Sequence, residues 1–156
     1  MRGLLLGADV VSVRDVEHAL ASFGDRYLAR IYTPAEIAYA RAAPSETARR
    51  LGARFAAKEA TIKALRAGQI GIDPRTIEIA KAADGGTELV LTGAASVAAR
   101  RAGAGELTAT LSHHGDLAIA VVVGERAPSP PSRILVRARQ RRTTPRANAP
   151  RGAHRP

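Results

Sequence analysis

Three charged residues close together in one segment are the most informative feature of the chain: Lys58, Glu59 and Lys63. Of the 24 basic residues only three are lysine, these two and Lys81. Arginine and lysine are not interchangeable, so two lysines in a chain that otherwise uses arginine indicate a need for a compact ammonium here. With a carboxylate between them, the segment could hold both a phosphate and a metal ion.

Two other segments carry residues that could take part in the same chemistry. Asp9 stands inside the apolar segment 4–13, where a carboxylate is expected to be buried and to need a partner. His113 stands in Ser112-His113-His114, at the end of a strand-like segment. Each has an ordinary alternative, because Asp9 could be a capping or salt-bridged residue and His113 a surface or core histidine.

The elements that must position these residues follow from hydrophobic periodicity and from cap and turn signals. Thr33-Pro34-Ala35-Glu36 is a capping box, and Ser45 is expected to cap the longest helix. The predicted helices are 15–23, 34–42, 46–66 and 94–102, and the predicted strands are 4–13, 76–80, 87–92, 107–111 and 117–123, with hairpin loops at 84–86 and 112–116. This order predicts an α+β fold with an antiparallel sheet and one long central helix.

The predicted long helix carries an apolar stripe with a charge inside it. At about 100° per residue, four apolar side chains share the stripe: Leu51, Phe55, Ile62 and Leu65. Lys58 falls within the stripe, which costs free energy unless its ammonium meets an anion or reaches water. Arg54 and Glu59 lie at its two borders and Lys63 a step further round. Glu59 and Lys63 could equally be a surface ion pair at i,i+4 spacing.

The net charge of +10 is concentrated at one end of the chain. Residues 127–156 hold eight arginines, no acidic residue and six of the nine prolines. Residues 1–126 carry the remaining 16 basic residues and all 14 acidic ones, a net of +2. We therefore expect one folded domain at 1–126 and a disordered Arg/Pro-rich tail at 127–156. Such a tail can bind nucleic acid or acidic surfaces weakly.

The overall composition excludes several classes of protein. Apolar residues make up 46% but aromatic ones only 3%, so the core must be built from Leu, Val, Ile and Ala. The absence of cysteine excludes disulfides and thiolate metal sites. The apolar run that ends at Asp9 is too short for a secretory signal or a membrane span. A soluble cytoplasmic protein with no membrane partner is the expectation.

Taken together and in order, three motifs resemble holo-acyl-carrier-protein synthase, the small bacterial-type branch of the 4′-phosphopantetheinyl transferase family. They are Gly7-Ala8-Asp9, Arg54-Phe55-Ala56-Ala57-Lys58-Glu59-Ala60 with Lys63, and Leu111-Ser112-His113. The segment 26–33 with Glu36 also looks like a helical region of that family. The resemblance covers residues 4–124, and the Lys-Glu-Ala-x-x-Lys helix is its most specific part. It implies the α+β transferase fold of this family for the folded domain.

The resemblance implies a reaction of lipid metabolism, typically fatty acid biosynthesis. A serine hydroxyl of apo-acyl carrier protein attacks the pyrophosphate of coenzyme A, the phosphopantetheine arm moves to the serine, and 3′,5′-ADP leaves. By position, Asp9 and Glu59 are implied to hold Mg²⁺ on the pyrophosphate, and Lys63 to bind phosphate oxygens. Arg54 and His113 are implied to contact phosphates of coenzyme A. Glu59, directly or through a water held by the metal, is the implied base.

The resemblance also implies a homotrimer whose active sites form between neighbouring subunits, so the three motifs need not converge within one chain. Two positions depart from the family pattern. Leu5 stands where the family often has a glycine, two residues before Gly7. Asp15 stands where many members carry an arginine that docks the acidic carrier, although Arg14 directly precedes it.

Two alternatives belong to other classes of function. One is a basic nucleic-acid-binding protein acting through the tail. The net charge of +2 on residues 1–126 and the scarcity of aromatic residues argue against such a role for the folded domain. The other is an inactive scaffold that keeps the transferase fold, against which the presence of Asp9, Glu59 and Lys63 argues.

Overall fold

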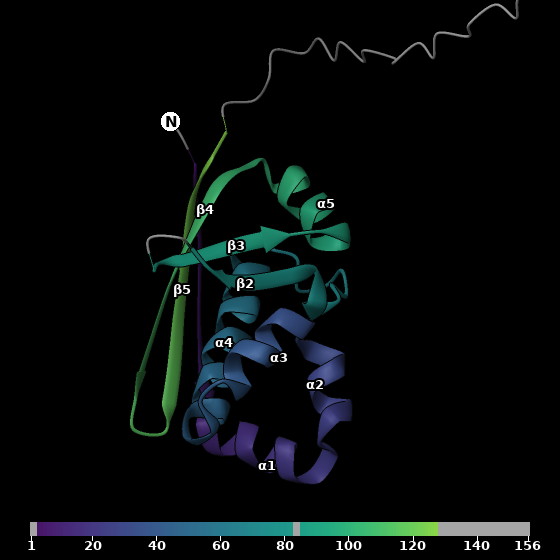
Figure 1. The fold of residues 1–156 in the computed structure, drawn as a ribbon. Helices are drawn as coiled ribbons and strands as arrows, with labels where there is room; N and C mark the ends of the chain where they lie inside the picture. The colour runs from purple at the N-terminus through teal and green to yellow at the C-terminus, as the bar shows by residue number, and fades with distance from the viewer. Residues whose placement is uncertain (1–2, 83–84, 128–156) are drawn as a thin grey trace, which may run out of the picture.

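The computed structural model describes residues 3–82 and 85–127 (Figure 1). The predicted tail from residue 128 onward and Asp84 of the predicted hairpin loop lie outside the described residues. The strands are β1 (Leu4–Ser12), β2 (Ile77–Lys81), β3 (Thr87–Leu91), β4 (Ala104–His114) and β5 (Leu117–Arg126). The helices are α1 (Val13–Phe23), α2 (Asp25–Ile31), α3 (Pro34–Arg41), α4 (Thr47–Ala64) and α5 (Gly93–Ala102). Among the helices of the described residues, none has the length and hydropathy needed to cross a bilayer.

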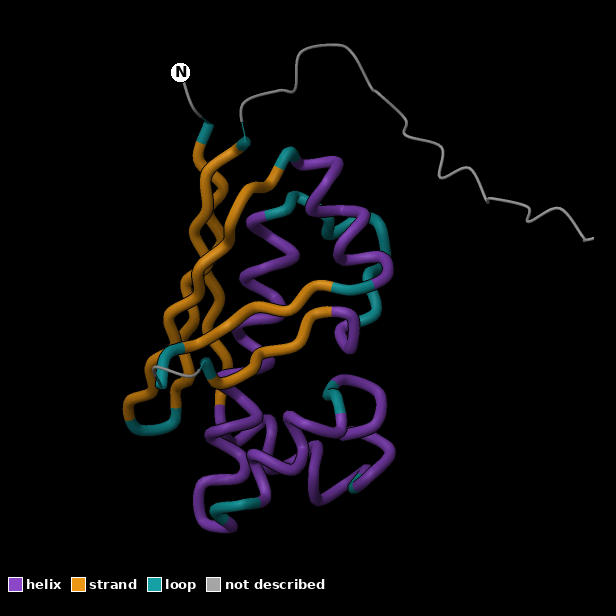
Figure 2. Tube along the Cα trace, turned by 45° about the horizontal axis from the view of Figure 1, so that its top comes forward, coloured by secondary structure: helices purple, strands orange, loops and turns teal. Residues whose placement is uncertain are grey.

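The strands form two antiparallel sheets, which confirms the predicted α+β class. One sheet has the order β1-β5-β4, and the other is the β2–β3 hairpin. The long helix α4 runs along one face of the three-stranded sheet, while α1, α2 and α3 gather at one end and α5 lies at the other (Figure 1). Figure 2 shows the hairpin as a separate layer beside α4. Helix α4 therefore contacts both sheets and stands at the centre of the domain.

The close approach of α4 to β1 depends on small residues at their contact. A Cβ atom added to Gly7 would lie 1.9 Å from the carbonyl oxygen of Ala60 and 2.6 Å from the amide nitrogen of Ala64. On the helix side, Ala56 and Ala60 are fully buried. Because side chains alternate along a strand, Asp9 points to the same side as Gly7. The absence of a side chain at residue 7 thus brings the Asp9 carboxylate close to α4.

The charge inside the apolar stripe of α4 has a buried anion as its partner. Lys58 is 0% exposed, and its Nζ lies 2.8 Å from Oε2 of Glu36, which is also buried. The same ammonium donates hydrogen bonds to the carbonyl oxygens of Pro74 and Ile77. Lys58 is therefore a core residue joining α4, α3 and β2. Of the two alternatives for its ammonium, an anion or water, the structure contains the anion, while the suggestion that Lys58 shares one site with Glu59 and Lys63 is wrong.

Most predicted elements are confirmed to within a few residues, and three details differ. Helix α2 was not predicted as an element of its own, because its seven residues are too few for a clear helical period. Strand β4 continues through His114, so the β4–β5 loop is only Gly115-Asp116. Ser45 does not cap α4. It lies in a 3-10 turn, Pro44–Glu46, and the carbonyl oxygen of Pro44 accepts the hydrogen bond of Thr47, the first amide of the helix.

The face of the three-stranded sheet that points away from α4 is largely apolar and uncovered in the single chain. Five of its large side chains are between 37% and 62% exposed: Leu4, Leu6, Val10, Ile119 and Val123. The register places Leu6 opposite Val123 and Val10 opposite Ile119, so these side chains form one continuous surface. An apolar patch of this kind commonly marks an interaction site.

Candidate active site

The structure brings Asp9 of β1 next to the α4 segment that carries Glu59 and Lys63. Nζ of Lys63 lies 2.6 Å from Oδ1 of Asp9 and donates a further hydrogen bond to the carbonyl oxygen of Ala8 at 3.3 Å. The Asp9 side chain is only 17% exposed. The expectation that this carboxylate has a partner is confirmed, in the form of the salt-bridged alternative, and the residue is half-buried and not fully buried. Among the described residues no ion pair joins Glu59 to Lys63, so the simple i,i+4 alternative is not what the structure contains.

Asp9 and Glu59 face one cavity of about 520 Å³, which we call the acidic hollow. Its other polar lining residues are Ser12, Asp15 and Tyr27, and its apolar wall includes Phe55. Three carboxylates thus line this cavity.

The environment of Glu59 in the acidic hollow disfavours the ionised form of its carboxyl group. Partial burial raises the pKa of Glu59, and the neighbouring charge of Asp9 raises it further, while Lys63 acts in the opposite direction. The hydrogen bond to Asp9 is the main cause that raises the pKa of Lys63, which therefore stays a cation. A carboxylate whose pKa is raised toward neutrality is suited to accept a proton from a substrate.

Arg54 and His113, the other two predicted site residues, line a different cavity of about 320 Å³. We call this cavity the cationic hollow. Its charged and aromatic lining residues are Tyr39, Glu46, Arg49, Arg50, Arg54, Lys81 and His113. Glu46, its one acidic lining residue among the described part of the chain, is paired with Arg49 at 3.1 Å. The cavity therefore carries an excess of positive charge and suits an anion.

Arg54 is a buried cation with an unused hydrogen-bond donor, which suits it to bind such an anion. Its residue is 7% exposed, and its buried Nε has no hydrogen-bond partner among the described residues. Burial is the main cause that lowers the pKa of Arg54, and the charge of Arg50 adds to it, whereas Tyr39 and Glu36 act to raise it. A buried donor without an acceptor costs free energy that a bound phosphate would recover.

The two hollows are separate within one chain. Asp9 and Glu59 line the acidic hollow but not the cationic one, and the reverse holds for Arg54 and His113. On α4, Arg54 and Glu59 are five residues apart, roughly 140° around the helix axis. The structure therefore brings Asp9, Glu59 and Lys63 together, and separately Arg54 and His113, but it does not bring the two sets into one cavity.

The acidic hollow fits the magnesium ion that the sequence resemblance implied. Among residues 3–82 and 85–127 there is no group of three or more acidic or histidine side chains that could hold a metal by itself. Asp9 and Glu59 are two, and the effect of Asp9 on the pKa of Glu59 is a repulsion that a divalent cation would relieve. Mg²⁺ is commonly held by one or two carboxylates together with substrate phosphates and water. The donor set is therefore compatible with Mg²⁺.

Sequence reasoning missed Tyr39 and Arg50 as members of the cationic hollow. The guanidinium carbons of Arg50 and Arg54 lie 4.6 Å and 4.0 Å from the centre of the Tyr39 ring. Arg50 and Arg54 are one turn apart on α4, and a pair of arginines at this spacing was a possible signal. Tyr39 lies on a different helix, and no local pattern connects it to them.

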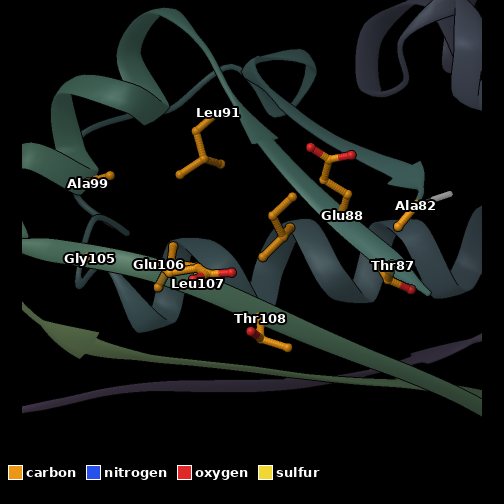
Figure 3. A pocket seen from close by; sticks show the side chains of 10 residues that line it. Ala82, Thr87, Glu88, Leu91, Ala99, Gly105, Glu106, Leu107 and Thr108 are labelled. Carbon is orange, nitrogen blue, oxygen red and sulfur yellow. The ribbon is translucent and has the colours of Figure 1, made fainter. Parts of the chain in front are cut away.

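A third cavity, of about 510 Å³, lies between β3, α5 and β4 (Figure 3). Its wall includes Leu91, Ala99 and Leu107, with Glu88 and Glu106 as the charged members. None of the predicted site residues lines it. This cavity and the acidic hollow are similar in volume, so volume alone does not show which cavity carries the candidate site residues.

Known proteins resemble this chain over most of the described residues. The family model described as the 4′-phosphopantetheinyl transferase superfamily matches residues 5–122. The holo-[acyl-carrier-protein] synthase of Solidesulfovibrio magneticus is 46% identical over 121 residues, which cover 77% of this chain and 96% of the relative. That of Paramagnetospirillum magneticum is 44% identical over 131 residues, covering 80% of this chain and 97% of the relative.

Solved structures agree with the sequence comparisons. The holo-[acyl-carrier-protein] synthase from Neisseria meningitidis has a TM-score of 0.66 at 32% identity, with 76% of this chain and 95% of that one covered. The synthase from Helicobacter pylori, solved in complex with coenzyme A, has a TM-score of 0.67 at 28% identity, with 76% and 98% covered.

Proposed function

Because the chain belongs to the 4′-phosphopantetheinyl transferase superfamily, we propose that it acts as a holo-[acyl-carrier-protein] synthase. It transfers the 4′-phosphopantetheine arm of coenzyme A to a serine of apo-acyl carrier protein and releases 3′,5′-ADP. The observation that carries this proposal is the pairing of Asp9 with Lys63 beside Glu59, at the junction of β1 and α4. The coenzyme A complex of the Helicobacter pylori relative supports the identity of the donor.

In the proposed reaction, the serine oxygen of the carrier attacks the phosphorus that bears the pantetheine arm. A new bond forms between this oxygen and phosphorus, and the bond from the same phosphorus to the bridging oxygen breaks. The bridging oxygen leaves as part of 3′,5′-ADP. Glu59 is the proposed acceptor of the serine proton, in keeping with its raised pKa. The cationic Lys63 would bind phosphate oxygens as a point charge.

Asp9 and Glu59 are the residues that would hold Mg²⁺. When bound, this ion supplies polarisation of the phosphorus and neutralisation of the charge on the leaving phosphate. The protein itself orients the two carboxylates. Gly7 contributes to that orientation, because its missing side chain lets β1 approach α4.

Arg54 and His113 would bind phosphate of coenzyme A in the cationic hollow. Since this hollow and the acidic hollow are separate in one chain, we propose that coenzyme A bridges two subunits of a homotrimer. The exposed apolar face of the β1-β5-β4 sheet supports such an association, because it offers a surface that a second copy can cover. Coenzyme A is an intracellular metabolite, and we place the reaction in the cytoplasm.

Mass spectrometry of apo-acyl carrier protein incubated with coenzyme A tests the proposed function. A gain of one phosphopantetheine arm that requires Mg²⁺ is the expected result. No gain with several apo-carriers, from protein shown to be folded by circular dichroism, would instead support an inactive scaffold. Carriers of fatty acid and of polyketide synthesis should both be included, because the preferred carrier is not part of the proposal.

Replacing Lys63 with arginine is expected to lower kcat/KM about tenfold or more, although the charge is kept. The planar guanidinium cannot reproduce the compact ammonium that reaches both Asp9 and the carbonyl oxygen of Ala8. Steady-state kinetics with coenzyme A as the varied substrate measure the effect. The matched control is Arg101→Lys, the reverse exchange at an exposed residue of α5 that lines neither hollow. Kinetics like those of the parent would exclude a point-charge role for Lys63.

We place the catalytic domain in residues 1–126 and assign no catalytic role to the Arg/Pro-rich residues 127–156. The family match to residues 5–122 supports this boundary. A chain that ends at Arg126 is expected to keep turnover within about twofold and to lose any salt-dependent binding of nucleic acid. Activity assays and filter binding at several salt concentrations measure both. An inactive truncated chain that still folds would contradict the boundary.

A further inference from the structure

Arg54 and Arg50 lie near each other in the cationic hollow, and among the described residues neither is in a salt bridge with a carboxylate. They lie one turn apart on α4, and two guanidinium groups at this spacing repel each other. Arg50 accordingly acts to lower the pKa of Arg54. Other contacts of Arg50 and Arg54 must therefore offset the repulsion and fix the two side chains. One such contact is the hydrogen bond that a side-chain nitrogen of Arg54 donates to the backbone carbonyl oxygen of Arg50 at 3.2 Å.

Tyr39 of α3 supplies the remaining contacts of the two arginines. Its ring centre lies 4.0 Å from the guanidinium carbon of Arg54 and 4.6 Å from that of Arg50. Both distances are well within the range of cation–π attraction. Its backbone carbonyl oxygen also accepts a hydrogen bond from Arg50 at 2.8 Å. One residue therefore contacts both cations of the hollow.

The position of Tyr39 is itself fixed by the core. Glu36, one turn earlier on α3, is 1% exposed and is bound by Lys58 of α4 and by the amide of Ile79 in β2. Helix α3 is thereby attached to α4 and β2 directly beneath the hollow. Because a close-packed interior has low compressibility, these contacts of Glu36 fix the position of the α3 backbone at Tyr39 relative to α4.

We propose that Tyr39 is a positioning residue that presets Arg50 and Arg54 to receive one phosphate group in the cationic hollow. This inference deepens the proposed function and rests on it. Preset donors bind more tightly because less side-chain freedom is lost on binding. The buried Nε of Arg54, which has no partner among the described residues, is the donor that such a phosphate would satisfy.

The chemistry of the hollow indicates which phosphate of coenzyme A it receives. Its one carboxylate within the described residues, Glu46, is already paired with Arg49. A metal-bound pyrophosphate needs carboxylates close by, and Asp9 and Glu59 line the other hollow. The phosphomonoester on the ribose is a terminal dianion that needs no metal. We therefore assign the Tyr39–Arg50–Arg54 cluster to the ribose phosphomonoester.

Calorimetric binding of 3′,5′-ADP and of 5′-AMP to the full-length protein tests the role of Tyr39. The two ligands differ only in the 3′-phosphate, which is the phosphomonoester on the ribose of coenzyme A. We expect Tyr39→Leu to weaken 3′,5′-ADP about tenfold and to leave 5′-AMP unchanged, while Tyr39→Phe stays within about twofold of the parent. Turnover should show the same pattern, with KM raised for coenzyme A, not for dephospho-coenzyme A, and kcat unchanged. Arg41→Leu is the control, because Arg41 is on α3 but pairs with Asp25 away from the hollow.

A double-mutant cycle separates positioning from a general loss of packing. If Tyr39 acts through Arg54, Tyr39→Leu should have no further effect on 3′,5′-ADP binding in an Arg54→Lys background. Tyr39→Gln provides a second ringless variant if the leucine variant does not fold. Equal weakening of both nucleotides, as expected if the ring stacks on the base, would overturn the proposal, and so would no weakening of either. A parent protein that binds 3′,5′-ADP no better than 5′-AMP would overturn the assignment of the ribose phosphate to the cationic hollow, whereas failure of the proposed function would show as no mass gain on the carrier.

Discussion

Replacing Lys58 with methionine is expected to lower the free energy of unfolding by about 3–5 kcal/mol, because it leaves a buried charge without its partner. The three N–H groups of the ammonium have three acceptors: Glu36, Pro74 and Ile77. Methionine removes all three contacts while filling a similar volume. The Glu36 carboxylate keeps only the amides of Thr33 and Ile79. Urea unfolding followed by circular dichroism measures the change.

Two further variants show whether the buried ion pair is the cause. Glu36→Gln combined with Lys58→Met should recover part of the loss, since no unpaired charge then remains in the core. Lys81→Met, at an exposed lysine, should change the stability by no more than about 0.5 kcal/mol. If Lys58→Met unfolds at the same urea concentration as the parent, the Lys58–Glu36 pair does not anchor α3 to α4.

The second large effect concerns activity and not stability. Glu59→Gln is expected to reduce kcat at least 100-fold, because it removes both the proposed base and a proposed metal ligand. Asp9→Ala should be similarly damaging through the metal. The fold should survive both changes. Glu17→Gln makes the same chemical change at an exposed glutamate of α1 and should leave turnover intact. Turnover retained in Glu59→Gln would refute both assignments.

The pH dependence of stability gives Glu59 a signature that does not depend on activity. Burial and then the charge of Asp9 raise its pKa in the folded state above the unfolded value. The folded state therefore binds this proton more tightly, and ionisation of Glu59 costs stability. The cost appears as the pH rises from the ordinary glutamate range through the raised pKa, and it is complete above it. Glu59→Gln should remove this cost, so the variant should be at least as stable as the parent at pH 7 and show less gain on acidification.

Local sequence patterns predicted the helices and strands well where one face of the element is buried. The capping box at Thr33 and Glu36 is present in the structure, and α4 differs from its prediction by one residue at its start and two at its end. Helix α2 was missed, because Gly24 separates it from α1 and its seven residues cover only two turns. The cap at Ser45 was wrong, because Pro44 begins a 3-10 turn whose first carbonyl oxygen accepts from the amide of Thr47.

The site was less accessible to local patterns, because its contacts join distant parts of the chain. Asp9 and Lys63 are 54 residues apart and Lys58 and Glu36 are on different helices. The motif order suggested the first pairing, but nothing in the sequence named Glu36 as the anion for Lys58. The contact of Tyr39 with Arg50 and Arg54 depends on how α3 packs against α4, which periodicity does not determine.

The opposite charges of the two hollows have a consequence for symmetry. A two-fold interface buries the same surface patch of both copies, so both hollows would have to lie within one patch. They lie instead on different sides of α4. A heterologous interface, in which the cationic hollow of one copy meets the acidic hollow of the next, engages each hollow once. Such an arrangement closes into a ring when the rotation between copies allows it. If coenzyme A bridges two copies as proposed, the number of complete sites in a closed ring would equal the number of copies, and an isolated copy would have none.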